Sequence, residues 1–270
     1  MDRVALPETC CPGEVATIWI RSGYAAYLGP SLRLDPHSGS VHCVAVGIDA
    51  PFTVRVDADQ RTVRSAFIPA RTRHQVVAES GRMLFCYLPT LLSGVERCTT
   101  DTLGAIGLTH RHESALIDQM RQANPLDPAA LLRRIADTDT PAITDARIRA
   151  TVRTIRADPA GTLGAPALAT EVGLSTSRFL HLFSAQTGTS LRRYRLWSRM
   201  MRVAAAAERG HDLTTAASDA GFASPSHFSD AFHAMFGLTA TTLLANGTRL
   251  IVGNRSDGPI ARPPVRCDSG

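Results

Sequence analysis

The stretch TAASDAGFASPSHFSDAFHAMFG, residues 215–237, has the pattern of a short helix, a tight turn and a second helix. Phe228 and Phe232 are four residues apart, which places both side chains on one face of a helix. Gly221 before them and Gly237 after them can adopt the positive φ that ends a helix. The spacing therefore predicts a helix-turn-helix whose second helix buries a Phe stripe.

The same pattern occurs earlier in the chain, in ALATEVGLSTSRFLHLFSAQTG, residues 167–188. Both copies have an Ala four residues before a Gly, then two Phe residues four apart, then a closing Gly. These positions are Ala169, Gly173, Phe179, Phe183 and Gly188 in the first copy, and Ala217, Gly221, Phe228, Phe232 and Gly237 in the second. A small Ala lets two helices approach closely, so each copy is predicted to form the same compact unit.

Each second helix has a recognisable beginning. Ser175 and Ser224 stand where an N-cap is expected, and Pro225 suits a first turn. Between the copies, residues 190–210 predict one helix whose main part spans about 27 Å, close to the distance of about 34 Å between successive major-groove faces of DNA. Its apolar face is predicted to contain Leu191, Tyr194, Trp197, Met201 and Ala204.

The charge distribution also points to this half of the chain. All 29 cationic side chains are Arg, against 24 Asp and Glu, for a net charge of +5. Residues 1–110 carry ten of each sign, whereas residues 145–247 carry 11 Arg and seven acidic residues. Helix-turn-helix units and Phe stripes are also ordinary packing devices. Their duplication, their spacing and the local Arg excess together favour nucleic-acid binding.

These features resemble the DNA-binding domain of the AraC-type (arabinose-regulator) family of bacterial transcription factors, over about residues 145–246. The matching signs are LSTSRFLHLF, GTSLRRY, Arg199 and GFASPSHFSDAFHAMFG. The resemblance implies a transcription regulator that binds double-stranded promoter DNA, with RNA polymerase as a further partner. It implies base contacts from Ser177, Leu180 and His181 in the first recognition helix and from Ser226, Ser229 and Asp230 in the second.

Three positions depart from the family pattern: His181 and Asp230 stand where Arg is usual, and Ala240 replaces a usual Pro. Asp accepts only from base amines and is repelled by phosphates, so the second helix is expected to prefer other bases or to hold DNA less tightly. An alternative is a regulator that has lost sequence reading and binds DNA only through its Arg excess. The Arg side chains expected on phosphates, or else solvated, are Arg178, Arg192, Arg193, Arg195 and Arg202.

The N-terminal part, from Ala16 to Leu88, consists of short β-type runs between turn residues. Residues 52–67, FTVRVDADQRTVRSAF, predict a hairpin. LRLDPHSGSVHCVAV followed by SAFIPARTRHQVV resembles the small β-barrel (cupin) sensor domain that often precedes this DNA-binding domain. The resemblance implies a small-molecule effector, of unknown identity, in the barrel. The aromatic side chains that could line its lumen, or simply form core, are Trp19, Tyr24, Tyr27, Phe67, Phe85 and Tyr87.

Metal-binding cupins use an H-x-H pair, a carboxylate and a later His, for which the candidates here are His37, His42 and His74. His37 and His42 are five residues apart, an odd offset that points strand side chains to opposite faces, and no Glu follows. We therefore expect a metal-free pocket, no cofactor and no enzymatic activity. The alternative function is a metal-dependent cupin enzyme with an accessory helical domain.

Residues 113–123 and 128–136 predict two amphipathic helices, which match the region that pairs two copies in this family. The resemblance implies a homodimer formed through Leu116, Ile117, Met120, Leu131, Leu132 and Ile135.

The expected fold class is α+β, with a cupin-like barrel and two dimerisation helices before an all-α double helix-turn-helix domain. The expected parts are a barrel (1–100), a helical dimerisation segment (101–137), a linker (138–145), the DNA-binding domain (146–247) and a disordered tail (248–270). The start of the chain lacks a signal-peptide pattern and no run reaches membrane-spanning length, so a cytoplasmic location without a membrane partner is expected. Six Cys without a CxxC pair are expected to be free thiols.

Overall fold

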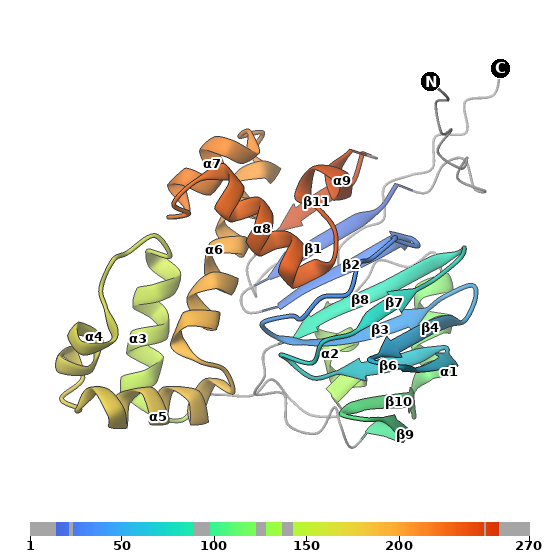
Figure 1. Cartoon of the computed structure of the whole chain (residues 1–270), viewed down its shortest axis with the longest axis horizontal. Helices are drawn as coiled ribbons and strands as arrows, with labels where there is room; N and C mark the ends of the chain where they lie inside the picture. Colours follow the sequence, from blue (N-terminus) through green and yellow to red (C-terminus); the bar gives the residue numbers. More distant parts are fainter. Residues whose placement is uncertain are drawn as a thin grey trace.

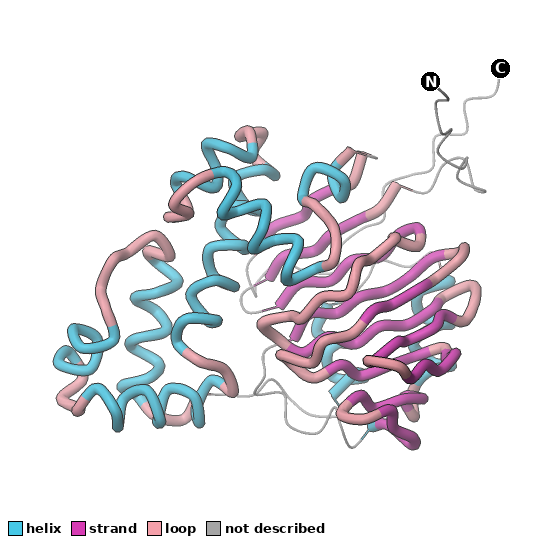
Figure 2. The backbone as a smooth tube through the Cα atoms, viewed as in Figure 1, coloured by secondary structure: helices cyan, strands magenta, loops and turns pink. Residues whose placement is uncertain are grey.

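The computed structural model describes residues 15–21, 24–88, 98–122, 128–136, 143–245 and 247–253. A β domain and a helical domain lie side by side (Figure 1), with the strands gathered on one side and most helices on the other (Figure 2). This arrangement confirms the expected α+β class, with the sheet-rich part first and the helical part second.

The β domain has two sheets. Its large sheet contains, in spatial order, β11 (Arg249–Val252), β1 (Thr17–Arg21), β2 (Tyr24–Pro30), β8 (Arg82–Leu88), β3 (His42–Gly47), β6 (Ser65–Ile68), β10 (Ile106–His110) and β9 (Thr99–Leu103). Its small sheet contains β5 (Asp59–Val63), β4 (Phe52–Val56) and β7 (Gln75–Val77). The predicted hairpin is confirmed as β4 and β5, which pair antiparallel from Phe52↔Val63 to Val56↔Asp59.

Alternation along the central strands builds two cores. In β3, Cys43 and Ala45 face the core that lies between the two sheets, whereas Val44 and Val46 face the opposite side of the large sheet. All four side chains are buried, as the period of two in a strand requires when both faces are covered. Cys43 is a free thiol, as are the buried Cys86 and Cys98; the three other cysteines lie outside the described residues.

Helices α1 (Glu113–Arg121) and α2 (Pro128–Ala136) cover that opposite side (Figure 1). Their apolar residues are buried in one cluster with Trp19, Val44 and Leu84 of the sheet; the helix residues concerned are Leu116, Ile117, Met120, Leu131 and Ile135, with Leu132 packed against them. The helical pattern was therefore predicted correctly, but these side chains already have partners within the chain. They cannot serve as an open dimer surface without leaving their own sheet.

The structure differs from two expected domain boundaries. Residues 99–110 form the hairpin β9–β10 at the edge of the large sheet, rather than the start of a helical segment at residue 101. Gly104 makes its turn with a φ of 57°, and helix begins only at Glu113. The expected linker, 138–145, is described only from residue 143, where Asp145 already caps the next helix.

The second difference is at the end of the chain, where the sequence predicts disorder from residue 248. Arg249–Val252 instead form β11, which pairs parallel with β1. The backbone N–H of Arg249 donates to the carbonyl of Ala16 (2.7 Å), and that of Gly253 donates to the carbonyl of Ile20 (3.2 Å). The chain thus returns from the helical domain to extend the first domain's sheet. Residues 254–270 lie outside the described part.

The helical domain contains α3 (Ala146–Ala157), α4 (Ala165–Glu171), α5 (Thr176–Thr187), α6 (Leu191–Glu208), α7 (Leu213–Asp219), α8 (Pro225–Phe236) and α9 (Ala240–Leu244). The long helix predicted between the repeats is α6. Leu191 and Trp197 of its predicted face are buried, whereas Tyr194, Met201 and Ala204 are half-buried. Within the described residues, no helix combines the length and the apolar character needed to cross a membrane.

The two domains share one apolar core. Phe236 of α8 contacts Tyr87 of the large sheet edge to face, with ring centroids 5.2 Å apart, and Trp197 of α6 lies 6.4 Å from Phe236. Polar bonds accompany this contact: the Asp35 N–H donates to the carbonyl of Gly237 (2.8 Å) and the Ser38 N–H to that of Ala234 (3.1 Å). The C-terminal end of α8 is therefore fixed to the β domain.

Candidate nucleic-acid interface

The first helix-turn-helix unit comprises α4 and α5. The Ser175 hydroxyl accepts a hydrogen bond from the backbone N–H of Arg178 (3.3 Å), which confirms the predicted N-cap of α5. Gly188 ends the helix with a φ of 67°. Phe179 and Phe183 are fully buried, so the opposite face of α5 is turned to solvent. On it lie the three predicted base-reading residues, Ser177, Leu180 and His181, all exposed.

The second unit comprises α7 and α8. The Ser224 hydroxyl accepts from the backbone N–H of His227 (3.1 Å), which confirms the predicted cap. Gly221 has a φ of 86°, and a Cβ there would lie 2.8 Å from the Cα of Ala160, so both the conformation and the space require glycine. Phe228 is buried.

Along α8 the predicted base-reading residues lie before the part that touches the β domain. Ser226 and Asp230 are exposed and Ser229 is half-buried. Beyond them, the ring Nε2 of His233 lies 2.9 Å from a carboxylate oxygen of Asp35. Helix α8 is thus divided: its N-terminal half is open to solvent, and its C-terminal half is docked within the protein.

The five Arg side chains expected on phosphates fall into two groups. Arg178, Arg192 and Arg202 are exposed. Arg193 instead donates to the carbonyl of Gly39 in the β domain (3.2 Å), and burial lowers the pKa of its guanidinium. Arg195 donates to the carbonyl of Leu163. Arg193 therefore fixes the helical domain to the β domain, and Arg195 stabilises the helical domain internally.

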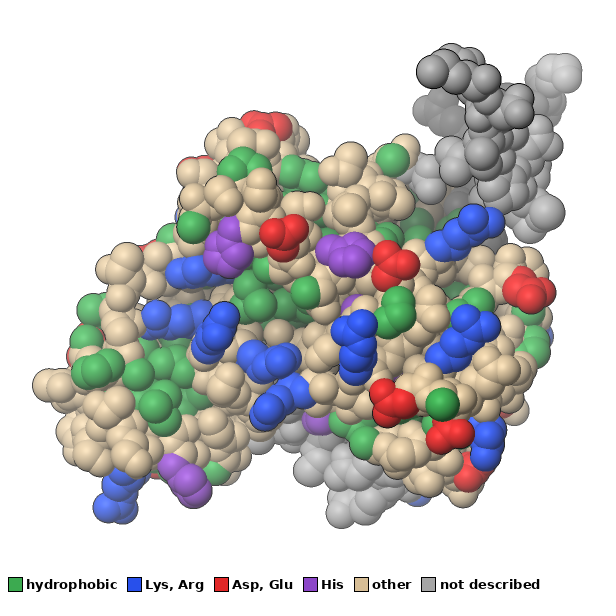
Figure 3. Space-filling model, viewed as in Figure 1, with side chains coloured by type: hydrophobic (Ala, Val, Ile, Leu, Met, Phe, Trp, Pro, Cys, Tyr) green, Lys and Arg blue, Asp and Glu red, His purple; other side chains and the backbone are tan. Residues whose placement is uncertain are grey.

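Basic side chains gather over the middle of the face shown in Figure 3, between the helical and β domains. Arg199, one of the positions that match the family pattern, is half-buried and donates through Nε to the carbonyl of Pro159 (3.0 Å). Its role here is to tie α6 to the loop between α3 and α4. The helical domain's Arg excess therefore serves structure and surface charge together.

The metal candidates do not converge. His37 and His74 lie side by side, with ring centroids 4.3 Å apart, and their backbones form an isolated β-bridge. His42 is elsewhere: its Nδ1 accepts from the backbone N–H of Ala70 (3.0 Å) and its ring packs on Phe67. No group of three His, Cys, Asp or Glu side chains among the described residues is arranged to hold a metal ion. The enzyme alternative has no three-ligand site in these residues.

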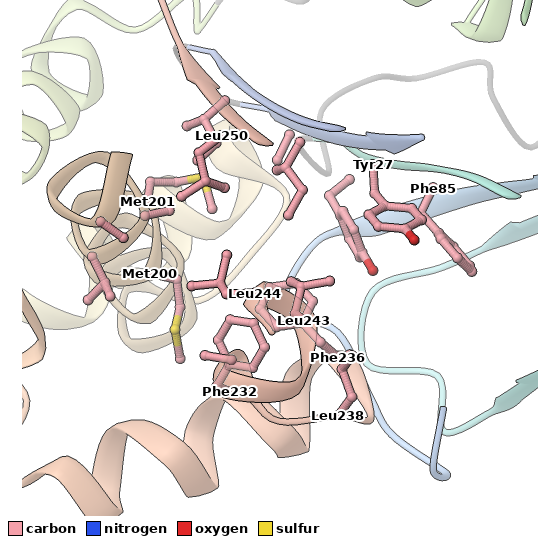
Figure 4. Close-up of a pocket in the computed structure, with 18 of the residues that line it drawn as sticks. Tyr27, Phe85, Met200, Met201, Phe232, Phe236, Leu238, Leu243, Leu244 and Leu250 are labelled. Atoms are coloured by element: carbon pink, nitrogen blue, oxygen red, sulfur yellow. The ribbon is translucent and has the colours of Figure 1, made fainter. Parts of the chain in front are cut away.

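Sequence reasoning missed a cavity at the junction of the two domains (Figure 4). Its volume is about 90 Å³, and its walls are almost wholly apolar. Three of the six aromatic residues expected in the barrel lumen, Tyr27, Phe85 and Tyr87, line it from the sheet. Trp19 and Phe67 belong to the opposite core under α1 and α2, and Tyr24 packs against that core.

The other wall of the apolar cavity comes from the helical domain and from β11. It includes Met200 and Met201 of α6, Phe232 and Phe236 of α8, Leu243 and Leu244 of α9, and Leu250 of β11. The cavity thus touches both the sheet and the second helix-turn-helix unit. Its position depends on how the two domains pack, which no local sequence pattern encodes.

Comparison with known proteins agrees with this architecture. Residues 168–246 match the family model described as "Helix-turn-helix domain". Among solved structures, ToxT from Vibrio cholerae is similar: a ligand-free variant has a TM-score of 0.54 at 10% identity, covering 83% of this chain and 98% of that chain. A second ToxT structure has a TM-score of 0.53 at 11% identity, covering 83% and 98%. None of the curated protein sequences matches this chain.

A further structure of ToxT, with an unsaturated fatty acid bound, has a TM-score of 0.51 at 10% identity and covers 83% of this chain and 96% of that chain. At such identities the likeness concerns the fold. Residues 168–246 are an AraC-type helix-turn-helix domain, which is a DNA-binding class. The chain joins this domain to a sheet-rich N-terminal domain, in a fold similar to that of ToxT.

Proposed function

We propose that the protein is a sequence-specific DNA-binding transcription regulator. The observation that carries this proposal is the pair of capped recognition helices, α5 and α8, each of which packs its Phe stripe inward and exposes the opposite face of its N-terminal half. The helix α6 between them has 18 residues, a length of about 27 Å. Held apart by this length, α5 and α8 suit neighbouring major grooves on one face of DNA. As a regulator of the bacterial type that it resembles, the protein would act in the cytoplasm, where bacterial DNA lies.

Base reading is assigned to the exposed turns of both helices. Ser177, Leu180 and His181 would meet one groove and Ser226, Ser229 and Asp230 the next. Exposed Arg178, Arg192 and Arg202 would contact phosphates, which position a protein on DNA without reading sequence. Arg193 and Arg195 are less available, because each donates to a backbone carbonyl within the chain.

The effector site of this proposal is the apolar cavity between the domains. ToxT, which shares the fold, has been solved with an unsaturated fatty acid. The cavity volume of about 90 Å³ is small, since ligand pockets usually measure about 300–1,000 Å³. The cavity would therefore accommodate only part of an apolar ligand, or it would widen when the ligand binds. A ligand between the sheet and α8 would shift the second unit and so change DNA affinity.

The proposal also includes two partners suggested only by the family resemblance, a second copy of the chain and RNA polymerase. The apolar residues of α1 and α2 are used in the chain's own core, so a dimer would have to use other surfaces. Sedimentation equilibrium across a hundredfold concentration range tests the dimer: a constant monomer mass would remove it from the proposal.

Selection of bound sequences from a random DNA pool tests the function itself. The purified full-length protein should enrich one motif at physiological salt. Retention of DNA without any enriched motif would replace the proposal with binding through Arg charge alone, and failure to retain DNA would overturn both.

A further inference from the structure

A second cavity adjoins the apolar cavity, with which it shares Ile20, Trp197 and Met201, and lies between the edge of the large sheet and α6. Its volume is about 400 Å³, within the usual range for small-molecule sites of about 300–1,000 Å³. The β domain contributes β1 and β11, which lie against α6 in Figure 1. The lining residues used below are Arg21, Trp197, Met201, Arg202, Arg209 and Val252.

The charged lining of this cavity is all of one sign. Arg21 comes from the sheet, Arg202 and Arg209 come from α6 and its C-cap, and Arg156 comes from α3. The described residues that line the cavity include no Asp or Glu. The Glu208 carboxylate is close by, accepting from the Val252 N–H at 3.5 Å, but it is not part of the lining.

Arg21, Arg202 and Arg209 have no acidic partner among the described residues. Within the described part of the chain, Arg202 and Arg209 make no ion pair. Arg21 is only 8% exposed, and its guanidinium meets only backbone carbonyls there, those of Ile20 (3.2 Å) and Ile251 (3.4 Å). A buried cation compensated by carbonyl dipoles alone is a favourable neighbour for an anion.

The uncharged part of the wall adds an apolar and aromatic surface. Trp197 is 5% exposed, and its indole N–H has no acceptor among the described residues. Met201 and Val252 supply apolar contact next to it. The cavity therefore offers cations and an aromatic surface together.

We propose that this cavity binds a small organic anion. Its carboxylate, sulfonate or phosphate would be held by Arg21, Arg202 and Arg209, and its apolar body would lie against Trp197 and Met201. The apolar cavity next to it shares Ile20, Trp197 and Met201 but contains no charged lining residue among those described.

One consequence rests on the proposed function. Arg202 is also one of the exposed cations expected on DNA phosphates, so a bound anion would withdraw it from DNA. Binding of the anion itself does not depend on DNA, and it is tested without DNA.

The test uses 8-anilinonaphthalene-1-sulfonate, an aromatic sulfonate whose fluorescence rises on binding, with the full-length protein. The double variant Arg202→Gln and Arg209→Gln should weaken its binding by about tenfold or more, because two charge-assisted contacts are lost. Arg153→Gln is the matched control: Arg153 is exposed on α3 and does not line the cavity. It should leave the affinity unchanged.

The uncharged dye N-phenyl-1-naphthylamine is the second probe, and its affinity should be the same in all three proteins. Unchanged sulfonate binding in the double variant would overturn the proposal, because the probe would then be held elsewhere. An equal loss with the uncharged dye would also overturn it, since the Arg side chains would be shaping an apolar site. Equal weakening of sulfonate binding by Arg153→Gln would overturn it as well, because the loss would then be a general effect of net charge.

Discussion

At the scale of single residues, Asp230 is the most informative side chain of the second recognition helix. It is exposed, it lies one turn after Ser226, and it precedes the part of α8 that docks on the β domain. Phe228 and Gly221 fix the shape of this unit independently of what residue 230 is. Asp230 therefore concerns which bases the helix tolerates, rather than whether the unit folds.

Replacing Asp230 with Arg should strengthen DNA binding and shift one or two base pairs of the selected motif toward guanine, because Arg donates to guanine O6 and N7. One changed contact with a base and a phosphate is expected to alter affinity by about tenfold. Fluorescence anisotropy with the selected DNA and repeated selection measure both effects.

Asp118→Arg is the control for this change, because Asp118 is exposed on α1 in the other domain and gives the same change in net charge. If both variants bind alike and select the wild-type motif, α8 does not enter a groove.

The pair His37 and His74 makes stability sensitive to acid. Burial lowers the pKa of both rings. For His74, burial and then the charge of the neighbouring His37 lower the pKa from 6.5 to about 4. The ring Nδ1–H groups donate to the carbonyls of Asp35 and Thr72, both at 2.9 Å. As pH falls below 6.5, these rings bind protons in the unfolded chain but remain neutral in the folded chain, so the free energy of unfolding decreases.

For His74 alone, the free energy of unfolding should be lower by about 2 kcal/mol at pH 5 than at pH 7.5. His74→Asn keeps a nitrogen donor near Thr72 but cannot titrate. The decrease in its free energy of unfolding between the two pH values should therefore be smaller than that of the wild type by about that amount. Urea unfolding of both proteins at the two pH values checks this. An equal loss in variant and wild type would mean that His74 is not the titrating group.

At the scale of elements, β11 is the feature that ties the end of the helical domain to the first domain. It pairs with β1 over Thr17↔Arg249 to Ile20↔Val252, and Leu250 reaches the apolar cavity. An edge strand that closes both a sheet and a domain junction should contribute to the stability of both domains.

Arg249→Pro removes the N–H that donates to the Ala16 carbonyl (2.7 Å), and it should lower the free energy of unfolding by about 1 to 2 kcal/mol. Arg249→Ala retains that N–H and loses only an exposed side chain, so it should change stability little. Urea unfolding compares the two. Equal stability of the Pro variant and wild type would show that β11 does not pair in solution.

Local patterns were sufficient to predict most elements, because caps and periodicity are properties of neighbouring residues. Ser175, Ser224 and the Phe pairs place α5 and α8 correctly, and the alternation in residues 52–63 predicts the hairpin. Strand β11 was missed although Leu250, Ile251 and Val252 are apolar, because a run of four residues next to a Pro-rich and Gly-rich tail is too short to signal a strand by itself. Its strand conformation comes from pairing with β1, more than two hundred residues away.

The candidate site also has one part that local sequence patterns predict and one part that they do not. The exposure of Ser177, His181 and Asp230 follows from helical periodicity and was predictable. The docking of Arg193 on Gly39 and the two cavities at the domain junction depend on tertiary packing. They could not be read from the sequence.

At the scale of the whole molecule, the central feature is a core shared by the two domains. Tyr87 from the sheet, Trp197 from α6 and Phe236 from α8 are in mutual ring contact, and the apolar cavity adjoins them. A change in the packing of this junction should move the second recognition helix, because Phe236 is the last residue of α8.

Filling the apolar cavity tests whether it is open space. Ala204 lines it from α6, and Ala204→Leu adds three apolar carbons, which should raise the free energy of unfolding by about 1 kcal/mol. The exposed helical residue Ala167 of α4 provides the control, Ala167→Leu, which buries nothing. Destabilisation of the Ala204 variant in urea unfolding would show that this space is already filled.

The central claim is that α5 and α8 occupy two neighbouring major grooves at once. Hydroxyl-radical footprinting on the sequence enriched by selection tests it most directly. Two protected blocks are expected on one face of the DNA, about 10 base pairs apart, with protection at the weaker block changed by Asp230→Arg. A single protected block, unaffected by that substitution, would contradict it.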